Sequence, residues 1–177
     1  FDKQKAMQQH QRMVEVYEAN GVRCHFVEAN EGLPSSVFTR DSSFMTPWGA
    51  VITSIQTPPR RQDYSVASDF YRNAGIPIWK WITENHFEGG DFVIAKPGVA
   101  LLGWSGDRST REGAEQVAGW MREMDWEAFI VPIPPQFVHM DAVVVMLEED
   151  LALVCEDALP SYAVDWLDKQ GIDRIIL

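Results

Sequence analysis

A pattern of helix, stop, strand and apolar hairpin recurs about every 50 residues along this chain. Apolar side chains fall at helical spacing over residues 6–20, 61–74 and 109–124, and a fourth helix is expected from Pro160, a residue favoured at the first helical position. The residues expected to stop the four helices are Gly21, Gly75, Asp125 and Gly171. Because repeats of this period usually form propellers or solenoids, the spacing favours a modular α/β architecture over an ordinary α/β domain with coincidental spacing.

Each stop is expected to lead into a strand, and each following helix to be preceded by a hairpin. The expected strands are residues 22–27, 76–79, 126–131 and 172–177, and the expected hairpins are residues 44–54, 92–104 and 142–155. Ser109 and Glu112 have the spacing of a capping box at the start of the third helix. The predicted repeating unit is therefore a strand, a loop, a hairpin and a helix.

Three polar motifs recur with the same period as this repeat, and each falls in a loop that leads into a hairpin. They are FTRD ending at Asp41, EGGD beginning at Glu88 and HMD beginning at His139. Equivalent loops of a circular array converge on one axis, so we expect these side chains to meet in space, with Gly89 and Gly90 allowing a close approach of the backbone. Each motif alone also has a structural explanation, such as a turn cap at Asp41, but their common period favours a shared site.

The expected cluster combines carboxylates with one histidine and nearby arginines. Its members are Asp41, Glu88, Asp91, His139 and Asp141, with Arg60 or Arg61 and Arg108 beside them. Carboxylates gathered around one point repel each other unless a cation lies there, and a guanidinium is the best-shaped organic cation because carboxylates bind it bidentately. A metal ion is the other class, but zinc sites use more His or Cys than the one histidine available here. The set therefore predicts an arginine-like amino acid as ligand, and neither a metal nor a cofactor.

Composition limits the partners. The net charge of −11 and the absence of a basic run argue against nucleic acid, and no apolar run approaches the roughly 18 residues of a membrane span. Cys24 and Cys155 lie far apart without metal or redox spacing, which indicates a reduced, cytoplasmic protein, although a single disulfide stays open. The sequence sets no oligomeric state and is compatible with a homo-oligomer.

The ordered motifs FTRD, PRRQ, EGGD, GDRST and HMD resemble the guanidine-modifying pentein superfamily. That superfamily contains the arginine deiminases, dimethylarginine dimethylaminohydrolases and arginine:glycine amidinotransferases, and the resemblance extends over nearly the whole chain. It implies an α/β propeller of five ββαβ modules, which agrees with the repeat. It also implies that residues 1–177 form a single catalytic domain, internal to a longer enzyme, which lacks its first strand and its C-terminal module.

The resemblance implies roles by position for the central residues. Asp41 and Glu88 resemble the acids that bind the substrate guanidinium, and His139 resembles the general acid/base that protonates the leaving amine and activates water. The superfamily's nucleophile is a cysteine after a glycine-rich stretch near the C-terminus, a motif that this sequence does not contain. Cys24 falls in an expected strand, and Cys155 precedes two acids that would raise the pKa of its thiol. The nucleophile is therefore expected outside this chain, and this chain alone is expected to be inactive.

The resemblance implies outer positions as well. Asp141 matches an acid of the deiminases and amidinotransferases, which favours these over the dimethylaminohydrolases. Arg61 or Arg60, together with Arg108, resembles the residues that clamp the substrate carboxylate, whereas Asp91 is expected to hold its loop. The sequence thus predicts a hydrolase acting on the guanidinium of arginine or a substituted arginine. An amidinotransferase and a non-catalytic pentein that binds a cationic amino acid are the alternatives.

Overall fold

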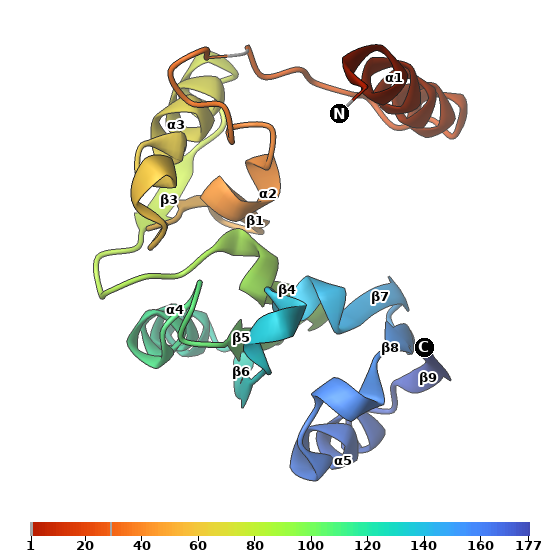
Figure 1. Cartoon of the computed structure of the whole chain (residues 1–177). Coiled ribbons are helices and arrows are strands. Elements are labelled where there is room, and N and C mark those ends of the chain that lie inside the picture. The colour runs from red at the N-terminus through yellow and green to blue at the C-terminus, as the bar shows by residue number, and fades with distance from the viewer. Residues whose placement is uncertain (1, 29) are drawn as a thin grey trace.

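Three similar modules make up most of the molecule in the computed structural model, which describes residues 2–28 and 30–177 (Figure 1). The first comprises β1 (Ser43–Thr46), β2 (Gly49–Ile52), α3 (Asp63–Asn73) and β3 (Ile78–Trp81). The second comprises β4 (Phe92–Lys96), β5 (Val99–Trp104), α4 (Arg111–Glu123) and β6 (Glu127–Pro132). The third comprises β7 (Val144–Glu148), β8 (Leu151–Val154), α5 (Ser161–Lys169) and β9 (Asp173–Ile176).

Each module has its own three-stranded sheet with the same topology. The first two strands form an antiparallel hairpin, and the third pairs with the second in parallel, as in the register of Leu102 with Ile130 between β5 and β6. Parallel neighbours need a crossover connection, which the helix of each module provides. The predicted α/β fold of ββαβ modules is confirmed.

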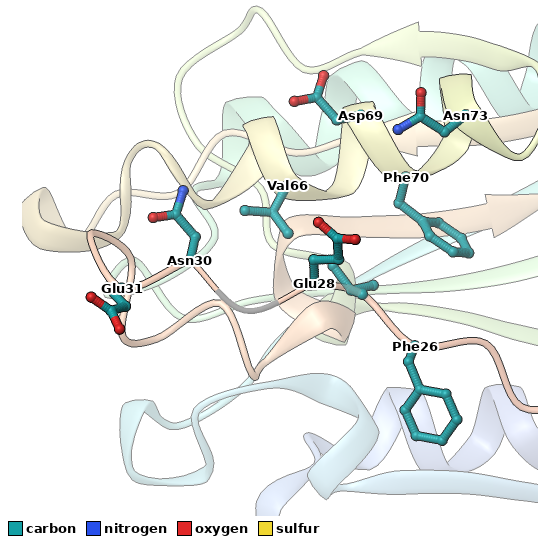
Figure 2. Close-up of a pocket in the computed structure, with 9 residues that line it drawn as sticks. Phe26, Glu28, Asn30, Glu31, Val66, Asp69, Phe70 and Asn73 are labelled. Carbon is teal, nitrogen blue, oxygen red and sulfur yellow. The ribbon is translucent and has the colours of Figure 1, made fainter.

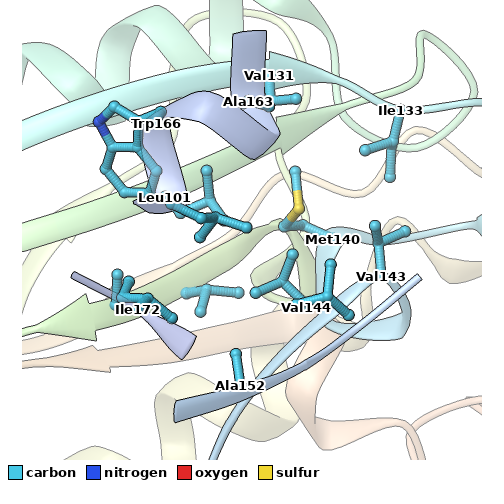
Figure 3. Close-up of a cluster of buried hydrophobic side chains, with 14 of the residues drawn as sticks. Leu101, Val131, Ile133, Met140, Val143, Val144, Ala152, Ala163, Trp166 and Ile172 are labelled. Carbon is cyan, nitrogen blue, oxygen red and sulfur yellow. The ribbon is translucent and has the colours of Figure 1, made fainter. Parts of the chain in front are cut away.

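The apolar core lies on both faces of the middle sheet. Side chains alternate across β4 and β5, so Phe92 and Leu102 pack in the cluster that contains α4 and Phe44 of β1. Val93 and Leu101 face the other way, into the cluster with β7, β8 and α5 (Figure 3). The middle module is therefore fixed against both neighbours, and its loops are held in register with theirs.

The N-terminal part begins with α1 (Lys3–Ala19), and α2 (Thr39–Ser42) follows just before β1. The expected strand 22–27 between them is wrong, because residues 22–27 form no strand. A strand needs a partner for its amide and carbonyl groups, and within residues 2–28 and 30–177 no strand pairs with this segment. Val22 and Phe26 remain exposed as a result.

The four predicted helix stops all adopt the left-handed conformation, with φ of 80° at Gly21, 68° at Gly75, 59° at Asp125 and 69° at Gly171. Two expected helix starts need correction. Thr110 caps α4 by accepting a bond from the Gly113 amide, so the predicted capping box at Ser109 is wrong. Pro160 precedes α5 in an extended conformation and is not its first residue. Among the described helices, none combines the length and the apolar character needed to cross a bilayer.

Candidate active site

The three predicted motifs meet at one place. Asp41 lies in α2, Glu88 leads into the short 3₁₀ helix Gly89–Asp91, and His139 leads into the short 3₁₀ helix Met140–Ala142. Each segment stands immediately before the first strand of its module. His139 Nε2 lies 3.6 Å from Asp41 Oδ1 and 3.4 Å from Glu88 Oε2. The convergence expected from the repeat is therefore present in the structure.

Glu88 is fully buried and held from two sides. Its backbone amide donates to Ser109 Oγ over 2.9 Å, and its Oε2 lies 3.4 Å from Arg108 Nη1. Ser109, which the sequence suggested as a helix cap, thus positions Glu88 instead. The other carboxylate oxygen, Oε1, is buried without a hydrogen-bond partner among the described residues. A buried, unpartnered carboxylate oxygen is costly, which indicates that a donor from elsewhere belongs there.

Asp91 holds the imidazole. Its Oδ1 accepts the Met140 amide at 2.8 Å, and its Oδ2 lies 3.2 Å from His139 Nδ1. This pair fixes the ring so that Nε2 faces Asp41 and Glu88, in agreement with the expectation that Asp91 holds its loop.

The two glycines of the EGGD motif allow this close packing. A Cβ on Gly90 would lie 2.7 Å from Cγ of His139, and a Cβ on Gly89 would lie 2.2 Å from the carbonyl oxygen of Arg40. Neither position has room for a side chain, so the sequence interpretation of these glycines is confirmed.

His139 is held in its charged form. Burial lowers the pKa of its imidazole, but the hydrogen bond with Asp91, the Glu88 carboxylate 3.4 Å away and the charges of Asp91 and Asp41 raise it more, to about 10. The residue before it, Val138, has φ 66° and ψ −59°, and the His139 amide donates to the Phe137 carbonyl over 2.7 Å. This is the tight γ-turn geometry, which is strained for a β-branched residue. The histidine therefore enters the site from a strained turn and carries a positive charge at neutral pH.

Of the two candidate arginines after FTRD, the structure brings only Arg60 into the cluster. Arg60 Nη1 lies 2.8 Å from Asp41 Oδ2 and 4.0 Å from Glu88 Oε2, and its Nε lies 3.0 Å from Asp63 Oδ2. The Nε of Arg61 donates to the Gln56 carbonyl instead, on an exposed side chain. Asp63 was not singled out from the sequence, although its position three residues after Arg60 is a spacing at which side chains pair on helices.

Asp141 lies beside the cluster rather than inside it. Its Oδ2 pairs with Arg40 Nε at 3.4 Å, and Arg40 also donates to the Phe92 carbonyl over 2.6 Å. Burial raises the pKa of the Asp141 carboxyl, while the charges of Arg40 and His139 lower it. Arg40 lies within the FTRD motif, but no pattern in the sequence distinguishes it from its neighbours.

The donor set suits an organic cation better than a metal ion. Ligand atoms of Asp41, Glu88 and His139 lie within 4.8 Å of one another, as a metal site would require. However, nitrogens of Arg60 and Arg108 already lie 2.8 and 3.4 Å from the same carboxylates. A divalent ion beside these fixed charges would be repelled.

A separate hollow of about 590 Å³ lies between the segment after α1 and the outer face of α3 (Figure 2). Its carboxylates, on Glu28, Glu31 and Asp69, are exposed to solvent, and Phe26 and Phe70 provide apolar walls. The described residues that line it include none of the motif residues, so it is not the predicted site.

Comparisons with known proteins bear on the family and the fold of the chain. The family profile described as arginine deiminase matches residues 2–170. The uncharacterized protein YkgA of Bacillus subtilis is 30% identical over 167 residues, covering 93% of this chain and 56% of that protein. An arginine deiminase of Rhodococcus jostii is 32% identical over 150 residues, covering 77% of this chain and 36% of that protein.

Two solved structures have the same fold. A variant of the DDAH of Pseudomonas aeruginosa, complexed with citrulline, matches with a TM-score of 0.83 and 21% identity over 98% of this chain and 66% of that chain. The N-terminal domain of ArgZ, a cyanobacterial arginine dihydrolase bound to its product, matches with a TM-score of 0.87 and 18% identity over 99% of this chain and 64% of that chain. The chain thus spans one third to two thirds of the length of these relatives.

Proposed function

Because the chain belongs to the arginine deiminase family, within the pentein superfamily, we propose that its site binds a guanidinium group and takes part in hydrolysis of one of its C–N bonds. The substrate would be arginine or a substituted arginine, and the products would be citrulline and ammonia or an amine. The observation that carries the proposal is the cluster of Asp41, Glu88 and His139, in which Glu88 and His139 are buried and Nε2 of the histidine lies within 3.6 Å of both acids. The family relationship favours hydrolysis over transfer of the amidino group to an acceptor amine.

Asp41 and Glu88 would bind the substrate guanidinium. Each carboxylate can accept two N–H groups of a planar cation, and burial strengthens such charge-assisted bonds. Oε1 of Glu88, which is buried and has no hydrogen-bond partner among the described residues, would accept one of the substrate N–H groups. Arg108 would bind the carboxylate at the other end of the ligand, a role supported by its 30% exposed side chain, which contacts Glu88 at 3.4 Å.

His139 would move the protons. The nucleophile would be a cysteine thiolate outside Phe1–Leu177, whose sulfur bonds to the guanidinium carbon. The C–N bond then breaks, and the departing amine takes a proton from the His139 imidazolium. The neutral imidazole next takes a proton from water, the water oxygen bonds to the same carbon, and the C–S bond breaks to return the thiolate. Asp91 would keep the ring in place through both steps.

Partners and location follow from the same chemistry. A small guanidino amino acid is the only partner that the reaction requires. Cys24 and Cys155 are both free thiols, and a reducing compartment such as the cytoplasm would keep them and the catalytic thiolate reduced.

The test is an assay of the complete protein with arginine and with methylated arginines, measuring citrulline. We expect turnover, and we expect His139→Ala and Glu88→Gln to lower it at least about a hundredfold, the usual contribution of an acid/base group. Arg72→Ala is the matched control, because Arg72 pairs with Asp69 on the exposed face of α3 and its loss should leave turnover unchanged. Full activity in the folded His139→Ala protein would refute the assignment. Amidino transfer to an added amine without citrulline release would favour the amidinotransferase alternative, and binding of arginine without turnover would favour a non-catalytic pentein.

A further inference from the structure

The carboxylate of Asp41 already carries a guanidinium, which belongs to the chain itself. Arg60 Nη1 lies 2.8 Å from Asp41 Oδ2, and the same nitrogen lies 4.0 Å from Glu88 Oε2. These are the two acids assigned above to the substrate guanidinium. A bidentate contact with a substrate uses both oxygens of Asp41, and the substrate would have to share Oδ2 with Arg60.

Arg60 is held at this position by contacts that would remain if Asp41 were released. Its Nε bonds to Asp63 Oδ2 at 3.0 Å, and the Phe38 ring lies over the guanidinium with its centroid 5.3 Å from Cζ. Neither contact requires the bond from Nη1 to Asp41. Arg60 also ends the short 3₁₀ helix Pro58–Arg60, outside the regular hydrogen bonding of α3. The Arg60 side chain can therefore break its ion pair with Asp41 and keep the one with Asp63.

The arrangement is incompletely satisfied. Arg60 Nη2 and Glu88 Oε1 are both buried without a hydrogen-bond partner among the residues described. Arg60 is only 7% exposed, and an arginine whose role was only structural would be expected to place all its N–H groups. A buried donor and a buried acceptor that both lack partners, on side chains whose nearest printed atoms are 4.0 Å apart, indicate that the Arg60–Asp41 ion pair is one of two states and that a ligand completes the other.

The charges of the buried cluster point the same way. Four carboxylates, on Asp41, Asp63, Glu88 and Asp91, lie against three cations, on Arg60, Arg108 and the protonated His139. One negative charge is left over, which a single monovalent cation would balance. Such a cation can enter without expelling Arg60, provided that Arg60 exchanges one of its two acids.

We propose that Arg60 is a resident guanidinium, which competes with the substrate guanidinium for Asp41 and releases it when the substrate binds. The inference rests on the proposed guanidinium site and adds a competing internal ligand to it. The apparent affinity of the site for a free guanidinium is then the intrinsic affinity multiplied by the fraction of molecules in which Arg60 does not contact Asp41. If Arg60 contacts Asp41 in about nine tenths of the molecules, removal of the side chain raises the affinity about tenfold.

The experiment measures binding of guanidinium ion itself, without turnover. Wild type, Arg60→Ala and the control Arg72→Ala are titrated with guanidinium chloride up to about 50 mM, well below denaturing concentrations, at constant ionic strength. The His139 ring signal in NMR spectra reports occupancy. We expect guanidinium to bind Arg60→Ala about tenfold more tightly than wild type, and Arg72→Ala to behave as wild type. Tetramethylammonium, a cation without N–H donors, should show no such gain.

Equal or weaker guanidinium binding by Arg60→Ala, or no binding by either protein, would overturn the proposal. An equal gain for tetramethylammonium would also overturn it, since Arg60 would then act only as a neutralising charge. Arg60→Lys gives a second comparison if Arg60→Ala does not fold. An ammonium keeps the charge but cannot bridge Asp41 and Asp63 as a planar fork does, so tighter binding is expected there too. The binding experiment also distinguishes failure of this proposal from failure of the proposed hydrolysis. If the wild-type protein binds guanidinium but does not turn over arginine, the role proposed for Arg60 still holds.

Discussion

Replacing Asp91 by Asn should lower the pKa of His139 without removing the ring from the site. Asp91 Oδ2 is 3.2 Å from Nδ1 of the imidazole, and Oδ1 accepts the Met140 amide at 2.8 Å. Asparagine has nearly the same shape, and its carbonyl oxygen can still accept that amide. The substitution therefore removes mainly the negative charge that faces the imidazolium.

The magnitude follows from the wild-type pKa. Burial alone lowers the pKa of His139, and hydrogen bonds and charges overcome it to give about 10, against 6.5 for a free histidine. Each pKa unit corresponds to about 1.4 kcal/mol, so the rise corresponds to roughly 5 kcal/mol in favour of the charged form. Asp91, Glu88 and Asp41 share this effect. Removal of the negative charge of Asp91 should therefore lower the pKa of His139 by about one to two units.

The assay is an NMR titration of the imidazole signals, with His139 assigned by its absence in His139→Gln. Stability provides a second measurement. Because the folded pKa is raised, protonation of His139 stabilises the native state fully below about pH 6.5, and this contribution is lost as the pH rises towards about 10. The difference in unfolding free energy between wild type and His139→Gln should shrink over that window, and the window should end at lower pH in Asp91→Asn. A His139 pKa unchanged by Asp91→Asn would refute the assignment of Asp91 as the principal partner.

Two further substitutions test the packing around the His139 ring, and Gly119→Ala in α4 serves as a control. Gly90→Ala should displace His139 and lower the free energy of unfolding by about 1–3 kcal/mol, because its Cβ would lie 2.7 Å from the ring. Gly119→Ala in α4, where a Cβ would have no atom within 4 Å, should raise the free energy of unfolding by about 0.5–1 kcal/mol. Urea unfolding measures both changes. Val138→Gly should raise the free energy of unfolding by about 1 kcal/mol, because glycine adopts the positive φ of 66° without strain. If turnover of this variant is lower, the strained turn also orients the His139 side chain.

Local signals in the sequence predicted the modules well. Helix stops depend on residues that tolerate positive φ, and all four predicted stops, including the non-glycine Asp125, adopt it. The period of the motifs also predicted correctly that Asp41, Glu88 and His139 converge. Both inferences rest on features repeated in each module, so an error in one copy is corrected by the others.

The wrong predictions concern features that depend on tertiary contacts and not on local sequence. Segment 22–27 has strand composition, but no strand of the described chain pairs with it. Ser109 and Thr110 are equally good caps, and the fold uses Thr110 because Ser109 is bonded to the Glu88 amide. Arg60 and Arg61 are adjacent and chemically identical, so their opposite directions depend on backbone geometry that no local pattern specifies.

The high pKa of His139 links ligand binding to acid strength. An imidazolium with a pKa of about 10 holds its proton too firmly to be an efficient donor near neutral pH, where the best general acids have pKa values close to the ambient pH. A guanidinium bound to Asp41 and Glu88 would weaken the attraction of both carboxylates for the imidazolium and leave Asp91 as its main partner. Binding of the cation should therefore lower the pKa of His139 towards the working range, so that the proton becomes available when a substrate is present to receive it. The same NMR titration repeated at saturating guanidinium measures this coupling, and a pKa that stays near 10 in the bound state would contradict it.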